Sequence, residues 1–425
     1  MILAVRSLYI ALIGLTFLLA KLSFGLPARS LVLVALFLAF AAFFPRQVSD
    51  YFERHIGFFL FCLSLTLIGF ALTIYRGSDV SAAARFMNEE MIQVYLTFSC
   101  VYLACAILGP VSVFRIFIVF TMASGAVAIL QFLGLDFAWT LREILSGLQQ
   151  EPVELQQWIA ARERALGLSY STMNLGYQTI SCLLAVLLMC NARLFRAGAF
   201  NGFAFFALLI GIATGVRSLL LAAAAAAVIS NVLLLHSDRR DQRFNFIVFV
   251  LGAVAVLSLL SAISPELRIF SASDDSAAGR LVLAKLGMNL ALDNPFGFGW
   301  GFDSRNYYWL YWSQLLHYQN ADAAYAHGLH NYFLNLFLTY GALGALVFVI
   351  ALLAATRQLL LATLVFLPYF LNSFFHNGGP FFGEIYFWFA YALFVYLYDQ
   401  GLLSKPLAAG ATRRTGPRPE LAPAR

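Results

Sequence analysis

The sequence is poor in charge: only 11% of its 425 residues are Asp, Glu, Lys or Arg, where soluble proteins have about 25%. Hydrophobic residues make up 61% of the chain, and the mean hydropathy is +0.81. This composition excludes a soluble enzyme, a disordered chain and a fibrous repeat. The long uninterrupted apolar runs also exclude an outer-membrane barrel, whose strands alternate apolar and polar residues. What remains is an all-α, polytopic membrane protein, because backbone in lipid must satisfy its own hydrogen bonds within helices.

Cysteine is scarce as well, and several catalytic signatures are missing. The chain has no Walker loop, no Asp-x-Asp motif and no zinc signature, so we predict no cofactor and no metal. The cysteines show neither metal-type spacing nor a disulfide framework, and we expect them to behave as small buried hydrophobes. All five lie inside apolar runs: Cys62, Cys100, Cys105, Cys182 and Cys190.

Apolar runs long enough to span a bilayer recur along the chain. A spanning helix needs about 20 mostly apolar residues, and this criterion predicts about 12 helices. The first run follows a single basic residue, Arg6, and has no small-residue cleavage site, so it predicts a spanning helix and not a signal peptide. The predicted helices centre on Leu12, Leu36, Leu65, Val101, Phe120, Leu183, Leu208, Ala224, Val250, Leu338, Val365 and Ala390.

The few basic residues indicate an orientation. The net charge is +6, from 27 basic and 21 acidic residues. With the N-terminus in the cytoplasm, 14 basic residues fall in cytoplasmic loops and the tail, and only five in short outer turns. Both termini are then cytoplasmic. An excess of this kind is ordinary for a membrane protein, so we expect no nucleic-acid partner.

Two long polar segments interrupt the helices, and both fall on the outer face. We expect N-terminal spanning helices over 1–134, a first outer loop over 135–172, and central helices over 173–264. A large outer loop with amphipathic helices follows over 265–327, then C-terminal helices over 328–400 and a disordered tail over 401–425. Because polar residues gather in loops over one face, we expect the chemistry there.

The large loop contains several candidate residues. Arg280 is followed by apolar residues at helical spacing, which predicts a helix along the membrane surface. On residue type alone, a helix-start arginine facing solvent is the more common interpretation. Asn294-Pro295 ends that helix, and the glycines that follow allow a tight turn or a close backbone approach to a ligand. The aromatic run 307–312 is typical of an interfacial belt, with a platform for sugar rings as the alternative.

Arginine and histidine at helix ends supply the other candidates. Arg217 separates two apolar runs; it either snorkels to the headgroups or binds a phosphate with its planar fork. His330 opens a spanning helix, where it either caps the helix or accepts a proton. His327 and His330 could share a face, but no cysteine or carboxylate is placed to complete a metal site.

These residues resemble a known family when they are read together. His330-Asn331, followed by nine residues and then Gly341-Ala342-Leu343-Gly344, matches the His-Asn-x9-Gly-x-x-Gly pattern of the O-antigen ligase and polymerase superfamily. The stretch from Arg280 to Gly299 resembles the family's arginine, helix and Asn-Pro-x-Gly-x-Gly segment. Thr214 to Ser218 is similar to its Thr-Gly-Ser-Arg element, with Val216 in place of a small polar residue. Arg164-Ala165-Leu166-Gly167 and the later Asn174 resemble its earlier-loop element.

The resemblance implies a GT-C-like glycosyltransferase of the bacterial inner membrane, with its active site and two long loops in the periplasm. It implies that Arg217 and Arg280 hold the pyrophosphate of an undecaprenyl-linked glycan donor, and that His330 activates or positions the acceptor. We further predict substrate contacts from Arg164, Asn331, His327, Arg305, Tyr307 and Trp309. An O-antigen ligase, which transfers the glycan to lipid A–core oligosaccharide, is the first hypothesis. An O-antigen polymerase and a lipid-linked glycan flippase are the alternatives.

Overall fold

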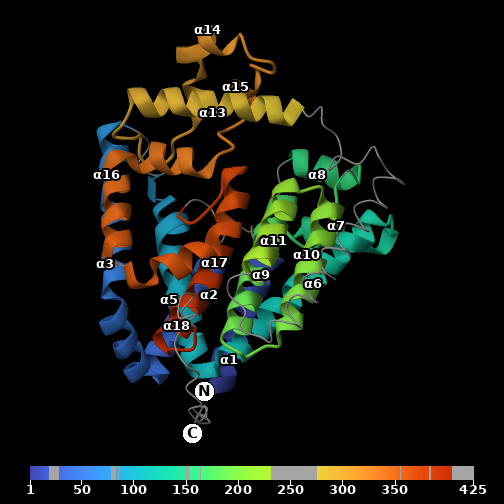
Figure 1. Ribbon diagram of the computed structural model, residues 1–425, viewed down its shortest axis with the longest axis vertical. Helices are drawn as coiled ribbons and strands as arrows, with labels where there is room; N and C mark the ends of the chain where they lie inside the picture. Colours follow the sequence, from blue (N-terminus) through green and yellow to red (C-terminus); the bar gives the residue numbers. More distant parts are fainter. Residues whose placement is uncertain are drawn as a thin grey trace.

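The computed structural model describes residues 1–18, 28–77, 83–84, 86–148, 153–162, 164–230, 275–354, 356–381 and 384–403. Every regular element of these residues is helical, which confirms the all-α prediction for this part of the chain. Figure 1 shows an upright bundle of helices, with one long helix lying across its end. The predicted span around Val250 and the predicted tail from 404 onward lie outside the described residues.

The N-terminal part of the bundle consists of helices packed side by side, of which α3 is the longest. They are α1 (Ile2–Phe17), α2 (Ala28–Phe43), α3 (Pro45–Tyr75), the short π-helix η1 (Met87–Ile92), α5 (Gln93–Leu108) and α6 (Pro110–Phe132). Both α3 and α6 begin with a proline, which suits the first turn because the missing N–H would have no intrahelical partner there.

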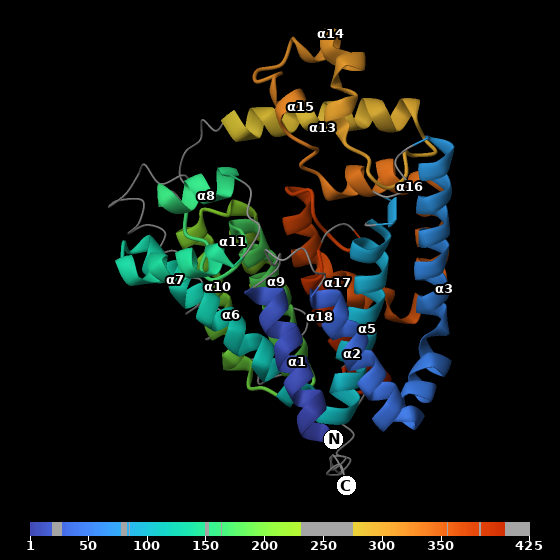
Figure 2. The ribbon, with the colours of Figure 1, turned by 180° about the vertical axis from the view of Figure 1, so that it is seen from behind.

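The central part surrounds one buried helix. Helix α9 (Thr172–Asn191) contacts α6, α17, α18 and its neighbours α10 (Ala197–Thr214) and α11 (Arg217–Ile229). Its side chains are buried along almost its whole length. Two shorter helices, α7 (Asp136–Gly147) and α8 (Val153–Ala160), form the first loop beside this group (Figure 2).

The C-terminal part contains the helices that lie across one end of the bundle and two further upright helices, α17 and α18. Helix α13 (Asp275–Asp293) lies across that end, with α14 (Trp312–Leu315) beyond it (Figure 1). The remaining elements are η3 (Ser304–Asn306), η4 (Tyr308–Tyr311), α15 (Ala323–Ala326), α16 (Tyr332–Ala354), α17 (Thr356–Phe374) and α18 (Tyr386–Asp399). The N-terminus lies at the opposite end from α13.

The helices have the length and composition of a membrane protein. Within the described part of the chain, five are long and apolar enough to cross a bilayer: α3, η1 with α5, α6, α9 and α16. Five shorter apolar helices lie within α1, α2, α10, α11 and α17. Each predicted centre other than Val250 falls within a helix, so the apolar runs correctly located the helices.

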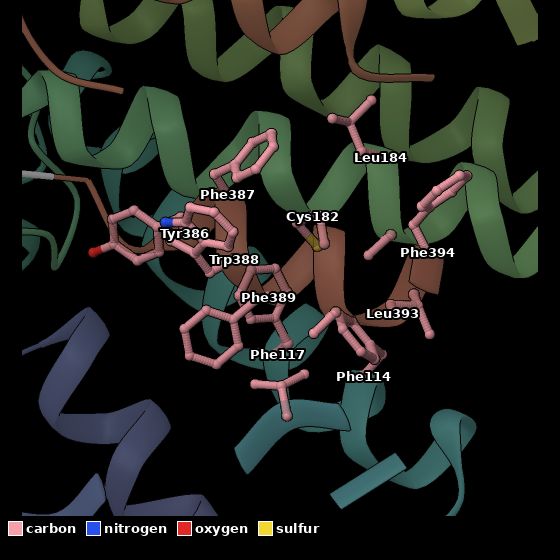
Figure 3. Packing of buried hydrophobic residues seen from close by; sticks show 14 of the residues in the cluster. Phe114, Phe117, Cys182, Leu184, Tyr386, Phe387, Trp388, Phe389, Leu393 and Phe394 are labelled. Atoms are coloured by element: carbon pink, nitrogen blue, oxygen red, sulfur yellow. The ribbon is translucent and has the colours of Figure 1, made fainter. Parts of the chain in front are cut away.

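Aromatic side chains fill the interior between α6, α9 and α18. Phe117 packs against Phe389 with ring centroids 5.3 Å apart, and Figure 3 shows both rings below Cys182 of α9. All five cysteines are unbonded and buried, which confirms their prediction as small hydrophobes. Between helices in lipid, close van der Waals packing of this kind holds the helices together.

Helix α16 bends sharply at Gly341, which has φ 61° and ψ −163°. The residues before the bend pack under α13, while those after it run beside α3 (Figure 1). The bend interrupts the helical ladder, and the 294–299 segment binds the groups that it frees. Phe298 N donates to Leu338 O at 2.7 Å, Gly299 N to Thr339 O at 3.0 Å, and Ala342 N to Pro295 O at 2.7 Å.

Glycines allow this contact between two backbones. A Cβ on Gly341 would lie 2.1 Å from the Phe296 carbonyl group, and one on Gly297 would lie 2.7 Å from Gly341 N. Both glycines also have positive φ, which other residues adopt only with strain. The tight turn that the sequence predicted is observed, because Gly297 N donates to Asn294 O at 3.0 Å. The same glycines let the turn approach the backbone of helix α16 closely.

Helix α3 anchors the same segment from the side. The Arg76 guanidinium donates to Gly297 O at 3.1 and 3.3 Å and to Asn294 Oδ1 at 3.2 Å. Trp300 N donates to Thr73 Oγ1 at 2.8 Å, and its indole N–H reaches Tyr340 OH at 3.1 Å. These bonds fix the end of α13 against the end of α3 and the bend of α16.

Candidate active site

His330 lies in the segment between α15 and α16, directly before the helix. The neighbouring Asn331 caps α16, because its Oδ1 accepts from Leu334 N at 3.1 Å. Asn335, one turn later, donates to Leu329 O at 3.0 Å. The backbone on both sides of His330 is therefore fixed, and its side chain is half-buried. The side-chain oxygen of Asn331 is therefore used to cap α16.

Arg280 lies in the second turn of α13 and is half-buried. Burial, the positive charge of Arg280 and the neighbouring His327 together lower the pKa of His330 from 6.5 to about 4. The His327 and His330 rings are 6.1 Å apart. At neutral pH, His330 is therefore an uncharged imidazole that can accept a proton.

A second buried histidine, His376, completes the group. It lies between α17 and α18, only 4% exposed, and its Nε2 is 2.6 Å from Ser218 Oγ. Burial, Arg280 and His330 lower the pKa of His376 from 6.5 to about 3. No motif in the sequence marks this histidine. Its only signal was the rarity of histidine, with six in the whole chain.

Arg217 is the first residue of α11, next to Ser218. The chain leaves α10 through Gly215 in the left-handed conformation, with φ 67°, and α11 starts after Val216 without a side-chain cap. A helix N-terminus carries a partial positive charge and free N–H donors. The half-buried Arg217 adds a full charge at the same place, so this turn favours an anion.

The loop between α17 and α18 is fastened on two sides. Tyr177 of α9 donates to Gly378 O, and Tyr332 of α16 donates to Pro380 O, each at 2.5 Å. The Tyr332 ring also packs against Gly379, where a Cβ would lie 2.4 Å from it. This loop therefore connects the start of α16, which follows His330, with the start of α11, which carries Arg217.

Glu384 is a buried carboxylate at the end of the same loop. It accepts from Tyr386 N at 2.7 Å, from Phe387 N at 3.0 Å and from the Tyr369 hydroxyl. Burial raises the pKa of Glu384 from 4.5 to about 7, against the opposing effect of these hydrogen bonds. Its oxygens cap α18, so the carboxylate has a structural role that the sequence did not indicate.

The first loop forms a separate turn against α6. Gln131 Oε1 accepts from Leu166 N and Gly167 N, both at 2.9 Å. Gly167 has φ 61° and lies against Ser124, where a Cβ would be 2.2 Å from the carbonyl oxygen. The Arg-Ala-Leu-Gly element is thus a fixed turn that presents the half-buried Arg164.

The remaining candidates lie in the segment that follows the glycine turn. Arg305 pairs with Asp303 through an Nη2–Oδ2 contact of 2.6 Å, and this hydrogen bonding lowers the pKa of the Asp303 carboxyl. Tyr307 packs on Phe298 with ring centroids 4.8 Å apart. Trp309 is 63% exposed, and its indole N–H donates to a backbone oxygen three residues earlier.

The polar side chains of α11, α13 and the segments that contain His330 and His376 form a group that can bind an anion. Arg280 acts on both His330 and His376, and His376 bonds to the turn that carries Arg217. Two arginines and a helix N-terminus provide positive charge, while the histidines stay neutral. Across the part of the chain that the structure describes, no three His, Cys, Asp or Glu side chains gather as a metal site requires.

Comparison with known proteins adds one finding. Residues 202–349 match the family model described as O-Antigen ligase. The match begins in α10 and ends in α16, so it contains Arg217, Arg280 and His330. No curated protein matched the chain, and no solved structure matched it.

Proposed function

Because the chain belongs to the O-antigen ligase and polymerase superfamily through residues 202–349, we propose that it is an O-antigen ligase. It transfers a glycan from undecaprenyl pyrophosphate to lipid A–core oligosaccharide, without a metal or cofactor. One observation carries the proposal: Arg280 lies close enough to act electrostatically on two uncharged histidines, beside the turn that bears Arg217.

Arg217 and Arg280 bind the pyrophosphate of the donor. An arginine fork can donate two parallel hydrogen bonds to phosphate oxygens, and the N-terminus of α11 adds backbone donors. As the bond between the sugar and the phosphate breaks, negative charge grows on the leaving pyrophosphate. Cations that are already in place stabilise that charge without reorganisation. This is the contribution that a metal ion makes in other transferases.

His330 accepts the proton of the acceptor hydroxyl. The hydroxyl oxygen attacks the anomeric carbon, its proton moves to His330, and the anomeric C–O bond to the pyrophosphate breaks. A base in this position contributes roughly 10²–10⁴-fold to the rate. In the structure, Arg280 helps to hold the pKa of His330 at about 4. Bound pyrophosphate would offset the charge of Arg280 and so raise the basicity of His330 when the donor is present.

The other candidates contact substrate around this centre. We assign the acceptor side to His327 and Asn331, a donor contact to Arg164, and glycan contacts to Arg305, Tyr307 and Trp309. The exposed Trp309 ring is the best placed of the last three to stack on a sugar. The architecture proposed with this function is GT-C-like, with about 12 spans by the length criterion, a periplasmic site in the bacterial inner membrane and cytoplasmic termini. The divisions at 134, 172, 264, 327 and 400 belong to the same proposal.

A reconstituted reaction tests the proposal. Purified protein is incubated with lipid-linked glycan and lipid A–core, and the products are separated by size and by lipid. Glycan on the core supports the ligase; longer lipid-linked chains would establish a polymerase instead. If neither forms, and lipid-linked glycan instead crosses the bilayer of a proteoliposome, the protein is a flippase. An Arg217→Ala variant serves as the control, because it should lose whichever transfer occurs.

A further inference from the structure

We propose that His376 is a positioning residue for the donor side of this site. Through its hydrogen bond to Ser218 it fixes the first turn of α11, and with it Arg217, relative to Arg280 and His330. The inference rests on the proposed function for the statement that this turn binds pyrophosphate. The hydrogen bond itself is a feature of the fold.

The bond joins distant parts of the chain in a buried place. His376 is 4% exposed and Ser218 is 6% exposed, and their side-chain atoms are 2.6 Å apart although 158 positions separate them in the sequence. A neutral imidazole has one donor and one acceptor nitrogen, so the bond to Nε2 constrains the orientation of both side chains. Removing one partner would leave the other polar group buried without a hydrogen bond, which costs free energy.

The loop that carries His376 is itself held in place. Tyr177 of α9 binds the loop at Gly378, and Tyr332 of α16 binds it at Pro380. Tyr332 is two residues after His330. The chain of contacts from His330 to Arg217 therefore runs through this loop and ends at the His376–Ser218 bond. Through that bond the loop sets the position of Arg217, the arginine proposed to bind the glycan donor.

A matched pair of substitutions isolates the hydrogen bond. Leucine has a volume close to that of histidine but no polar atom, whereas the amide nitrogen of glutamine can take a place near Nε2. We expect His376→Leu to raise the KM for lipid-linked donor about tenfold, the loss of one buried hydrogen bond. His376→Gln should stay within about threefold of the wild type. The KM for the lipid A–core acceptor should not change in either variant.

The KM readout separates positioning from mere stability. A variant that folds poorly has fewer active molecules, so its maximal rate falls while the KM of the folded molecules is unchanged. Ser218→Ala provides a second measurement, because it removes only the hydroxyl. If both side chains act through one bond, the double variant should show the same donor KM as each single variant, whereas independent effects would multiply. Should His376→Leu fail to fold, Ser218→Ala carries the test alone.

The outcomes distinguish this inference from the proposed function. Equal donor KM for His376→Leu, His376→Gln and wild type would overturn the positioning role, as would multiplied effects in the double variant. If Arg217→Ala abolishes transfer while Ser218→Ala and His376→Leu change nothing, only the positioning role fails. If Arg217→Ala leaves donor KM and rate intact, the proposed pyrophosphate site fails first.

Discussion

Two arginines of the large loop, Arg280 and Arg305, have opposite surroundings. Arg305 has a carboxylate two positions earlier and engages it through three contacts between 2.6 and 3.0 Å, at an exposed place. Arg280 is half-buried, and the neighbours on which its charge acts are His330 and His376. Arg305 is paired with a carboxylate of its own loop, and the charge of Arg280 acts on two neutral histidines.

This difference concerns the groups on which each positive charge acts. An arginine that already binds a carboxylate must give up that pair before it can bind a phosphate. A positive charge beside uncharged imidazoles gains most from an incoming anion, because burial weakens screening by solvent. The inner group of Arg280, His330 and His376 therefore suits catalysis, and the outer group of Arg305, Tyr307 and Trp309 suits packing and glycan contact.

The largest expected effect is at His330. His330→Ala removes the proposed base, so the transfer rate should fall by roughly 10²–10⁴-fold. The measurement is the initial rate of glycan transfer to lipid A–core by purified protein at saturating donor. His317→Ala is the matched control and should keep the wild-type rate, because His317 is exposed and lies just after α14. Full activity in His330→Ala would refute the base assignment.

Much of the fold was predictable because apolar runs carry strong information. A chain in lipid must satisfy every backbone N–H and C=O by internal hydrogen bonds, so the runs centred on Leu65, Val101 and Leu183 had to be helical. The bend at Gly341 was not predictable from hydropathy, because both halves of α16 are apolar. It depends on a segment more than forty positions earlier, 294–299, whose backbone supplies the missing hydrogen bonds.

The site was predictable where motifs mark it and hidden where only tertiary contacts do. Arg280 and His330 stood out as rare charged or titratable residues within the family pattern, and the structure brings them together. His376 and Ser218 lie 158 positions apart, and neither belongs to a motif. Tyr307 was equally prominent in the sequence, yet its ring packs on Phe298, because an aromatic run does not reveal which rings face inward.

The second prediction compares the two arginines directly. Arg280→Lys keeps the charge but loses the planar fork, so a site that binds phosphate through two parallel hydrogen bonds should lose about 10²-fold in kcat/KM. Arg305→Lys can still pair with Asp303 at the exposed surface, and its effect should stay within about threefold. Donor-dependent kinetics of both variants check this. Equal losses, or a mild Arg280→Lys, would remove the distinction between the inner and outer groups.

The third prediction concerns the bend that holds the inner group. A Cβ at Gly341 would meet the Phe296 carbonyl at 2.1 Å, and its φ of 61° with ψ −163° is accessible almost only to glycine. Gly341→Ala should therefore destabilise the protein by about 3 kcal/mol and lower its thermal midpoint in detergent. Gly328→Ala is the control, since a Cβ there meets nothing within 4 Å. Equal midpoints for the two variants would mean that the backbone contact does not define the bend.

The smallest effect is on the pH dependence of stability, and its sign follows from the pKa values of the inner group. His330 and His376 have pKa values lowered from 6.5 to about 4 and about 3. Between pH 6.5 and 4.5 the unfolded chain therefore binds two protons that the folded chain does not, and stability falls as the pH falls. Glu384, raised from 4.5 to about 7, binds a proton in the folded chain first and has the opposite sign. On balance the unfolded chain binds one more proton than the folded chain, so the free energy of unfolding falls by about 1.4 kcal/mol for each unit by which the pH is lowered.

Substitutions separate these contributions. The thermal midpoint of the wild type should fall when the pH is lowered from 6.5 to about 5. His376→Gln leaves one histidine against Glu384, so its midpoint should be nearly constant over that range, whereas Glu384→Gln should make the fall steeper. A midpoint of the Glu384→Gln variant that rises on acidification would mean that these histidines accept protons in the folded chain, which would contradict their uncharged state and the assignment of His330 as a base.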